Sequence, residues 1–284
     1  MSRIKNLVTA EWLINNIALD NLKICDATYF LPTHNRDAKE EYVKEHIVNA
    51  IRFDIDAIKD PDSDLPHMLP TSKQFEKHMQ QLGLRNKDTI VVYDNSPFLS
   101  SARAWWLLRM FGHEKVFVLD GGLKKYKSLG GKTENGKGKS FSKSDFKSSK
   151  PIDTAVIYFD KLFKKVMSTE KMQILDARSY ARFTGNEPEP RPGLRSGHIP
   201  KSCNVPLTSF LNAKTGEIVS NEEIKDIIAK AGVNLDEPII TTCGSGVTAT
   251  GIALALSLIG VTGNLVYDGS WAEWGSSSAP IETS

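Results

Sequence analysis

The segment Ile239-Ile240-Thr241-Thr242-Cys243-Gly244-Ser245-Gly246-Val247-Thr248-Ala249-Thr250-Gly251 lies near the C-terminal end of the 284-residue chain. Its β-branched run ends at a cysteine, a short turn with two glycines follows, and an apolar pattern then continues from Ile252 to Ile259. These features predict a strand, a loop and a helix, in that order. The backbone N–H groups of such a loop and the positive end of the helix dipole favour a negative charge in front of the strand. The segment therefore predicts an anion site within an α/β fold.

Cys243 lies where these N–H groups and the helix dipole would act. A cysteine near a helix N-terminus has a pKa of roughly 3.5–7.5 instead of about 8.5, so much of it is thiolate at neutral pH. Glycines in the turn can adopt positive φ and let the backbone approach an anion on the sulfur. We therefore predict that Cys243 is a nucleophile; the alternative is a small buried hydrophobe, the usual role of a lone cysteine at a strand end. The loop residues expected to hold the sulfur adduct are Gly244, Ser245, Gly246, Val247 and Thr248.

The composition is that of an ordinary globular protein, with 40% hydrophobic and 25% charged residues. The length suits one large or two ordinary domains. A formal net charge of +2 gives no reason to expect a nucleic-acid or membrane partner. Residues 1–16 lack the apolar core of a signal peptide, and the apolar stretch over residues 251–261 is too short to cross a bilayer. We therefore expect a cytoplasmic protein.

The three cysteines are far apart, and neither a C-x-x-C pair nor clustered histidines accompany them. This pattern favours a reducing compartment and argues against a disulfide framework or a zinc site. Cys25 lies in a predicted strand and Cys203 in a buried-looking segment, so we expect both to be inert.

The second half of the chain repeats the first. Residues 173–177 match residues 23–27, and residues 239–243 match residues 90–94. From Asp26 to Asp94 is 94 − 26 = 68 places, and from Asp176 to Cys243 is 243 − 176 = 67. Each half also has a capping box, which begins at Thr71 in the first and at Ser220 in the second.

Strands alternate with helical segments in both halves, which predicts parallel sheets with helices on both faces. We therefore expect an α/β protein of two homologous domains. The first covers residues 1–130 and the second residues 151–284. Residues 131–150 between them are rich in glycine, serine and lysine, which is typical of an exposed linker.

The alignment of the halves indicates which domain carries the chemistry. Where the second has Cys243, the first has Asp94, followed by Asn95-Ser96-Pro97. A carboxylate would repel a bound anion, and Pro97 has no N–H to donate. We therefore expect the first domain to be a degenerate copy.

The loop Cys243-Gly244-Ser245-Gly246-Val247-Thr248-Ala249 resembles the active loop of the 3-mercaptopyruvate sulfurtransferases, in the rhodanese superfamily. Four further segments look like landmarks of that family and occur in the same order: Leu65-Pro66-His67-Met68-Leu69-Pro70, Glu187-Pro188-Glu189-Pro190-Arg191, Gly197-His198-Ile199-Pro200 and Tyr267-Asp268-Gly269-Ser270-Trp271. The resemblance covers essentially the whole chain. It implies two tandem rhodanese-like domains of the bacterial type and a sulfurtransferase activity.

Arginines suit an anionic substrate because their fork donates two parallel hydrogen bonds to a carboxylate. The resemblance implies that Arg182 and Arg191 hold the carboxylate and carbonyl of 3-mercaptopyruvate. The alternative is that both are surface residues paired with Glu187 and Glu189.

A histidine oriented by a carboxylate can move protons near neutral pH. By resemblance, Asp56 and His67 act with Ser245 in a proton relay for the departing enolate. The alternative for His67 is an ordinary surface histidine.

The reaction that the resemblance implies runs through a persulfide on Cys243, releases pyruvate and passes the sulfur to cyanide, a thiol or a thioredoxin-like protein. We expect it to require no cofactor and no metal. A thiosulfate sulfurtransferase is the nearest alternative, although Gly244 and Ser245 are neutral where enzymes that favour thiosulfate have cationic residues. A non-catalytic rhodanese-like module that binds a partner or only carries sulfur is the other alternative.

Overall fold

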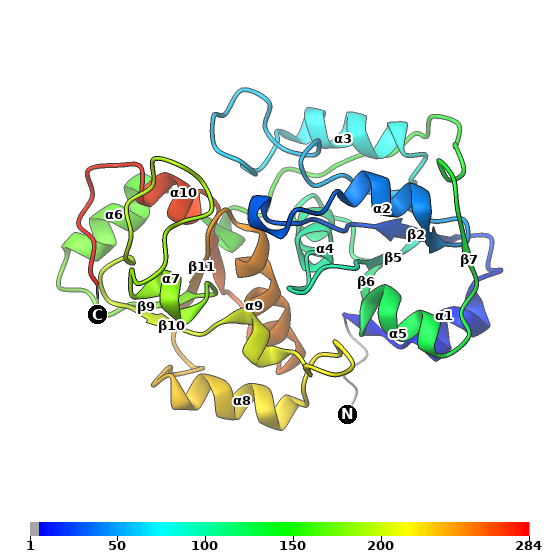
Figure 1. Cartoon of the computed structure of the whole chain (residues 1–284). Helices are drawn as coiled ribbons and strands as arrows, with labels where there is room; N and C mark the ends of the chain where they lie inside the picture. Colours follow the sequence, from blue (N-terminus) through cyan, green and yellow to red (C-terminus); the bar gives the residue numbers. More distant parts are fainter. Residues whose placement is uncertain (1–5, 284) are drawn as a thin grey trace. The chain divides into compact units, whose positions relative to one another are not determined.

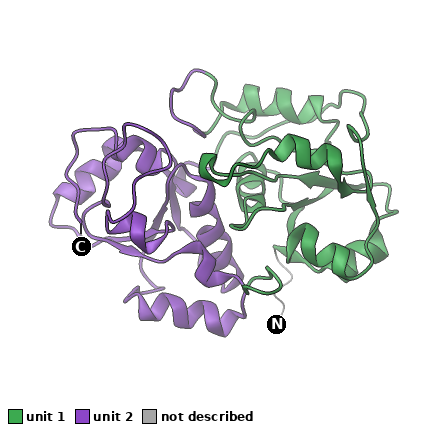
Figure 2. Cartoon of the chain, in the orientation of Figure 1, with its two compact units in different colours: residues 1–61, 69–151, 212–218 green, residues 62–68, 152–211, 219–284 purple. Residues whose placement is uncertain are grey.

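The computed structural model describes residues 6–283. Residues 1–5 of the first predicted domain and residue 284 of the second therefore lie outside the described part. The chain divides into two compact units, which Figure 2 colours separately. Of the described residues, the first unit holds 6–61, 69–151 and 212–218, and the second holds 62–68, 152–211 and 219–283.

The first unit is built on a five-stranded sheet of order β1-β6-β5-β2-β4 (Figure 1). Every neighbouring pair in this sheet is parallel. The strands are β1 (Leu7–Val8), β2 (Leu22–Asp26), β4 (Ile51–Arg52), β5 (Thr89–Tyr93) and β6 (Val116–Leu119). The helices are α1 (Ala10–Asn16), α2 (Ala38–Lys44), α3 (Ser72–Gln81), α4 (Ser101–Met110) and α5 (Gly122–Ser128), with a 3-10 turn at Pro32–His34. A separate antiparallel pair joins β3 (His46–Ile47) to β7 (Thr133–Glu134).

The second unit has a five-stranded sheet of order β10-β9-β11-β12-β8, again parallel throughout. The strands are β8 (Val156–Ile157), β9 (Gln173–Asp176), β10 (Ser202–Asn204), β11 (Ile239–Thr242) and β12 (Leu265–Tyr267). The helices are α6 (Phe159–Met167), α7 (Tyr180–Phe183), α8 (Asn221–Lys230), α9 (Val247–Leu258) and α10 (Ser270–Trp274), with 3-10 turns at Asp153–Ala155 and Leu207–Phe210. The predicted α/β architecture with parallel sheets is confirmed in both units.

Local sequence explains where several helices begin. Thr71 accepts the N–H of Gln74 while the Gln74 side chain accepts the N–H of Thr71, which is the predicted capping box of α3. Ser220 and Glu223 make the same exchange at α8. Helix α9 begins differently, at Val247, because Gly246 precedes it with φ +79°. A glycine is suited to this left-handed conformation, which turns the chain from β11 into the helix.

The central strands are buried because both faces of each sheet are covered. All four residues of β11 are buried, and so are Ile90 to Tyr93 of β5. This pattern is typical of parallel strands covered on both sides. None of the helices that residues 6–283 form is both long and apolar enough to span a bilayer.

The two sheets have corresponding strand orders, and this places Asp94 where the second unit has Cys243. Both residues follow the central strand of their sheet, β5 and β11 respectively. The carbonyl of Asp94 accepts the N–H of Leu123, and the carbonyl of Cys243 accepts the N–H of Trp271, each at the start of a helix after the next strand. Ligands of parallel α/β sheets bind beyond the carboxyl ends of the strands, so Cys243 stands at the expected place for a site.

Candidate active site

Cys243 lies directly after β11 and is 1% exposed. Two hydrogen bonds fix its loop to the start of α10, one from the Trp271 N–H to the Cys243 carbonyl and one from the Ala272 N–H to the Gly244 carbonyl, both at 2.9 Å. The first N–H groups of a helix have no acceptor within the helix, and in α9 these belong to Val247 and Thr248. The loop thus combines a buried sulfur with the N-terminus of a twelve-residue helix.

Ser270 is a contact of Cys243 that sequence reasoning did not find. Its Oγ accepts the Cys243 N–H at 3.3 Å and lies 3.9 Å from the Cys243 Sγ. The same hydroxyl donates to the Tyr267 carbonyl at 2.8 Å. Ser270 has φ +51°, a strained conformation for a residue with a side chain. The signal that could have found it is the alignment of Gly269-Ser270 with Gly121-Gly122, because Gly122 has nearly the same φ of +54°.

Arg182 projects from α7 and touches the loop beside Cys243. Its Nη2 atom would lie only 2.8 Å from a Cβ atom built on Gly244, closer than real Cβ contacts allow. Gly244 therefore admits the guanidinium because it has no side chain. The Arg182 side chain is only 10% exposed, so it is not a surface arginine, although it does pair with Glu189.

Arg191 follows Glu189 in the same loop and is partly buried. Its role in binding the substrate stays a prediction. Glu187 is exposed and lies 3.4 Å from the Ser179 hydroxyl, so the two glutamates of this loop have different surroundings.

His67 and Ser245 are in direct contact. The segment 62–68 belongs to the second unit, and Figure 2 gives it that unit's colour. The His67 Nδ1 atom lies 3.0 Å from the Ser245 hydroxyl and 3.3 Å from the Ser245 carbonyl. His67 is 2% exposed and Ser245 5% exposed. His67 is therefore a buried histidine beside the Cys243 loop, and not a surface histidine.

Asp56 belongs to the first unit and is exposed. It lines a cavity of about 260 Å³. The other lining residues are Tyr29, Phe30, Arg36, Asp37, Ala38, Lys39, Arg52 and Asp54. The part of Asp56 in a proton relay stays a prediction.

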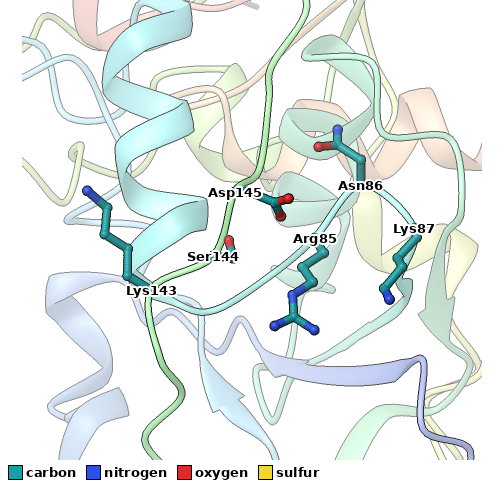
Figure 3. Close-up of a pocket in the computed structure, with 6 residues that line it drawn as sticks. All are labelled: Arg85, Asn86, Lys87, Lys143, Ser144 and Asp145. Atoms are coloured by element: carbon teal, nitrogen blue, oxygen red, sulfur yellow. The ribbon is translucent and has the colours of Figure 1, made fainter.

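A larger cavity of about 610 Å³ in the first unit contains none of the predicted site residues (Figure 3). It is lined by Arg85, Asn86, Lys87, Lys143, Ser144 and Asp145. The Arg85 and Lys87 side chains extend in one direction and Lys143 extends away from them, so the three cations do not converge. We assign no site there.

The two other cysteines lack the features of a nucleophile. Burial raises the pKa of Cys25 far above that of an ordinary thiol, and the carboxylate of Asp26 adds to the shift. Burial also raises the pKa of Cys203 to about 11. Both thiols are therefore neutral at physiological pH. Among residues 6–283, no three His, Cys, Asp or Glu side chains are grouped as metal ligands would be.

Comparison with known proteins agrees with this geometry. A family model for the rhodanese-like domain matches residues 9–129 and 160–277. The 3-mercaptopyruvate sulfurtransferase of Escherichia coli K12 is 40% identical over 277 residues, which cover 97% of this chain and 97% of that protein. The thiosulfate/3-mercaptopyruvate sulfurtransferase 1, mitochondrial, of Arabidopsis thaliana is 39% identical over 98% of this chain and 78% of its own length.

Solved structures give the same result. The crystal structure of the Tum1 protein from Saccharomyces cerevisiae matches with a TM-score of 0.90 and 35% identity, over 100% of this chain and 99% of that one. The resemblance drawn from the sequence is therefore confirmed. The chain belongs to the rhodanese family and, within it, to the enzymes known as 3-mercaptopyruvate sulfurtransferases.

Proposed function

We propose that this sulfurtransferase takes sulfur from 3-mercaptopyruvate, holds it as a persulfide on Cys243 and passes it to an acceptor, with release of pyruvate. The observation that carries the proposal is the position of Arg182, whose guanidinium lies against Gly244, the residue next to Cys243. A cation beside a nucleophilic sulfur can bind the carboxylate of a small thiol substrate there.

The first step is binding. Arg182 and Arg191 hold the substrate carboxylate and keto oxygen and present the thiol sulfur to Cys243. The Cys243 thiolate attacks that sulfur, a sulfur–sulfur bond forms, and the carbon–sulfur bond breaks with its electron pair passing to carbon. The product is pyruvate enolate, whose charge is delocalised onto the keto oxygen near the arginines.

The second step moves one proton. The proton lost by the substrate thiol is the one that the enolate carbon needs to become the methyl group of pyruvate, so no further proton source is required. Ser245 and His67, with Asp56, relay it. The 3.0 Å separation of the His67 Nδ1 atom from the Ser245 hydroxyl supports this relay, because proton transfer needs hydrogen-bond contact.

The persulfide that remains carries a negative terminal sulfur. We propose that the backbone N–H groups over residues 244–248 stabilise it together with the dipole of α9. A thiol, a thioredoxin-like protein or, in an assay, cyanide then attacks the terminal sulfur and regenerates the Cys243 thiolate.

Steady-state kinetics test the donor. We expect pyruvate release from 3-mercaptopyruvate, with a higher kcat/KM than for thiosulfate, because Gly244 and Ser245 add no cation for a dianion. Cys243→Ser abolishes turnover, and the matched change Cys203→Ser leaves it intact. A higher kcat/KM with thiosulfate would refute the donor assignment, and transfer from neither donor would leave a carrier or binding role.

The compartment also belongs to this proposal. Cys25, Cys203 and Cys243 are all free, as a reducing compartment such as the cytoplasm would keep them. One relative is named as mitochondrial. Microscopy of a C-terminal fluorescent fusion tests the proposal, and accumulation of the fusion in an organelle would refute it.

A further inference from the structure

Four charged side chains of the second unit form a buried chain of alternating sign, Asp176, Arg178, Glu189 and Arg182. Asp176 accepts from the Nε and Nη2 atoms of Arg178 at distances of 2.7 to 3.1 Å. The Arg178 Nη1 atom donates to Oε1 of Glu189 at 2.8 Å. The side chains of Asp176, Arg178 and Glu189 are at most 2% exposed.

Glu189 joins the buried part of this chain to Arg182. Its Oε1 accepts from the Arg182 Nε atom at 3.1 Å, and its Oε2 accepts from the Arg182 Nη2 atom. Such a two-point contact fixes the plane of the guanidinium as well as its position. Because Arg178 donates to Oε1 as well, the Glu189 carboxylate has an anchor that does not depend on Arg182.

The contact also decides which edge of Arg182 is left for a ligand. A guanidinium has five N–H groups, of which Glu189 takes the Nε–H and one on Nη2. The remaining hydrogen on Nη2 and one of the two on Nη1 form the end-on edge. A Cβ atom built on Gly244 would lie 2.8 Å from Nη2 and 3.9 Å from Nη1, whereas Nε is not among its three nearest atoms, so the end-on edge faces the residue after Cys243.

We propose that Glu189 is a positioning residue for sulfur transfer, which holds Arg182 so that its end-on edge receives the carboxylate of the donor. The inference rests on the proposed function, because it assigns to Arg182 a carboxylate to bind. Without Glu189, a long arginine side chain would spread over several rotamers, and substrate binding would have to restore the correct one.

The test compares two donors in Glu189→Gln. One is 3-mercaptopyruvate, and the other is 1-mercaptopropan-2-one, which keeps the thiol and the keto group but lacks the carboxylate. Rates of persulfide formation are expressed per folded molecule. The kcat/KM for 3-mercaptopyruvate should fall roughly ten- to a hundredfold, the effect of losing a charged hydrogen-bond contact, with most of the change in KM. The rate with 1-mercaptopropan-2-one should fall at least severalfold less, because this donor has no carboxylate contact to lose and keeps only the keto group.

Two further variants complete the design. Glu187→Gln, in the same loop but exposed, is the matched control and should leave both donors unaffected. Arg182→Met should show the same donor dependence, and combining it with Glu189→Gln should add little, because both changes remove one function. If Glu189→Gln does not fold, Glu189→Asp keeps the charge but shortens the reach by one methylene, and it should show the same split between donors.

The outcomes separate the two levels of the proposal. If the wild type forms no persulfide with 3-mercaptopyruvate, the proposed function fails. If the wild type reacts but the Glu189 variants lose both donors equally, Glu189 only supports the fold and the inference is overturned. Full additivity with Arg182→Met would also overturn it.

Discussion

Among single residues, Gly244 and Arg182 determine which groups lie beside the sulfur that we propose as the nucleophile. A cation placed against the loop requires the residue after Cys243 to have no side chain, and the spacing of 2.8 Å leaves no room for a methyl group. Glycine is therefore needed at position 244 because it lets the Arg182 guanidinium come close to the loop. Gly244 does not have the positive φ for which glycine is otherwise favoured. The reason for a glycine here is therefore the space that it leaves for Arg182.

Gly244→Ala should push the Arg182 guanidinium away from the loop. We expect kcat/KM for 3-mercaptopyruvate to fall by about tenfold, which corresponds to about 1.4 kcal/mol of transition-state stabilisation. The midpoint of thermal unfolding should change little, because the guanidinium is at the end of a flexible side chain and can shift. Initial rates of pyruvate release measure the first effect and calorimetry the second. An unchanged kcat/KM would show that the contact has no part in binding.

Cys203 should respond to pH as a buried thiol. Its pKa of about 11 means that the thiolate fraction in the folded protein is still rising tenfold per pH unit at pH 9. In a Cys25→Ser/Cys243→Ser variant, the rate of iodoacetamide alkylation should rise with that slope until about pH 11. In urea the rise should end near pH 8.5, the pKa of an ordinary thiol. A plateau near pH 8.5 in the folded protein would contradict the raised pKa.

Single residues also show the limit of sequence reasoning. Cys243 could be found because a strand, a turn and a helix surround it in the sequence itself. The contact of Ser270 with Cys243 is harder to predict, because it joins two separate segments and only the alignment with Gly122 points to it. For Arg182, the alternative of a surface pair included the correct partner, Glu189, but the structure shows that this pair is buried.

At the level of elements, the start of α10 holds the Cys243 loop by three hydrogen bonds. Two come from the backbone of Trp271 and Ala272, and the third joins the Cys243 N–H to the Ser270 hydroxyl. The first unit makes the corresponding backbone contact at Asp94 but has Gly122 in place of the serine. Ser270 has a left-handed backbone, and a glycine at this position would relieve the strain. A serine is expected here if its hydroxyl has a function.

Ser270→Gly and Ser270→Ala should separate strain from function. Both variants lack the hydroxyl, so both should transfer sulfur about tenfold more slowly than the wild type. The glycine variant should be more stable than the alanine variant by roughly 1 kcal/mol, because only alanine keeps the strained left-handed backbone. Urea unfolding measures the difference, and equal stability of the two variants would show that position 270 carries no strain.

The corresponding loop of the first unit explains why a carboxylate can stand in place of the cysteine. Asp94 Oδ1 accepts the N–H and the hydroxyl of Ser96, and Oδ2 accepts the N–H of Ser101. Burial raises the pKa of Asp94, whereas these hydrogen bonds lower it. The loop thus binds a negative group of its own chain, which is consistent with the expectation of a degenerate copy.

Elements were predicted best where local sequence determines them. The strand at 239–242 and both capping boxes follow from residue type and spacing alone. The pairing of β3 with β7 could not be predicted in this way, because it joins residues 46–47 to residues 133–134, which lie inside the predicted linker. Segment 62–68 is a similar case, since its membership of the second unit depends on contacts distant in sequence.

For the whole molecule, we propose that the two rhodanese-like domains have different tasks. The rhodanese-like family model matches both parts of the chain, but the reactive cysteine, its arginine and the His67–Ser245 contact all lie in the second unit. The first unit holds Asp56 and the self-bound Asp94 loop. The alignment of the two halves led to this prediction because a repeat lets one copy serve as a reference for the other, and the division of tasks stays a prediction.

The measurement that tests the account most directly is the mass of the intact protein after one turnover with 3-mercaptopyruvate and no acceptor. We predict a gain of one sulfur atom, located on Cys243 by peptide mapping, and one pyruvate released for each sulfur bound. Addition of cyanide should remove the extra mass and yield thiocyanate. Release of pyruvate with no sulfur on Cys243, or an equal gain of mass in Cys243→Ser, would contradict sulfur transfer through this residue.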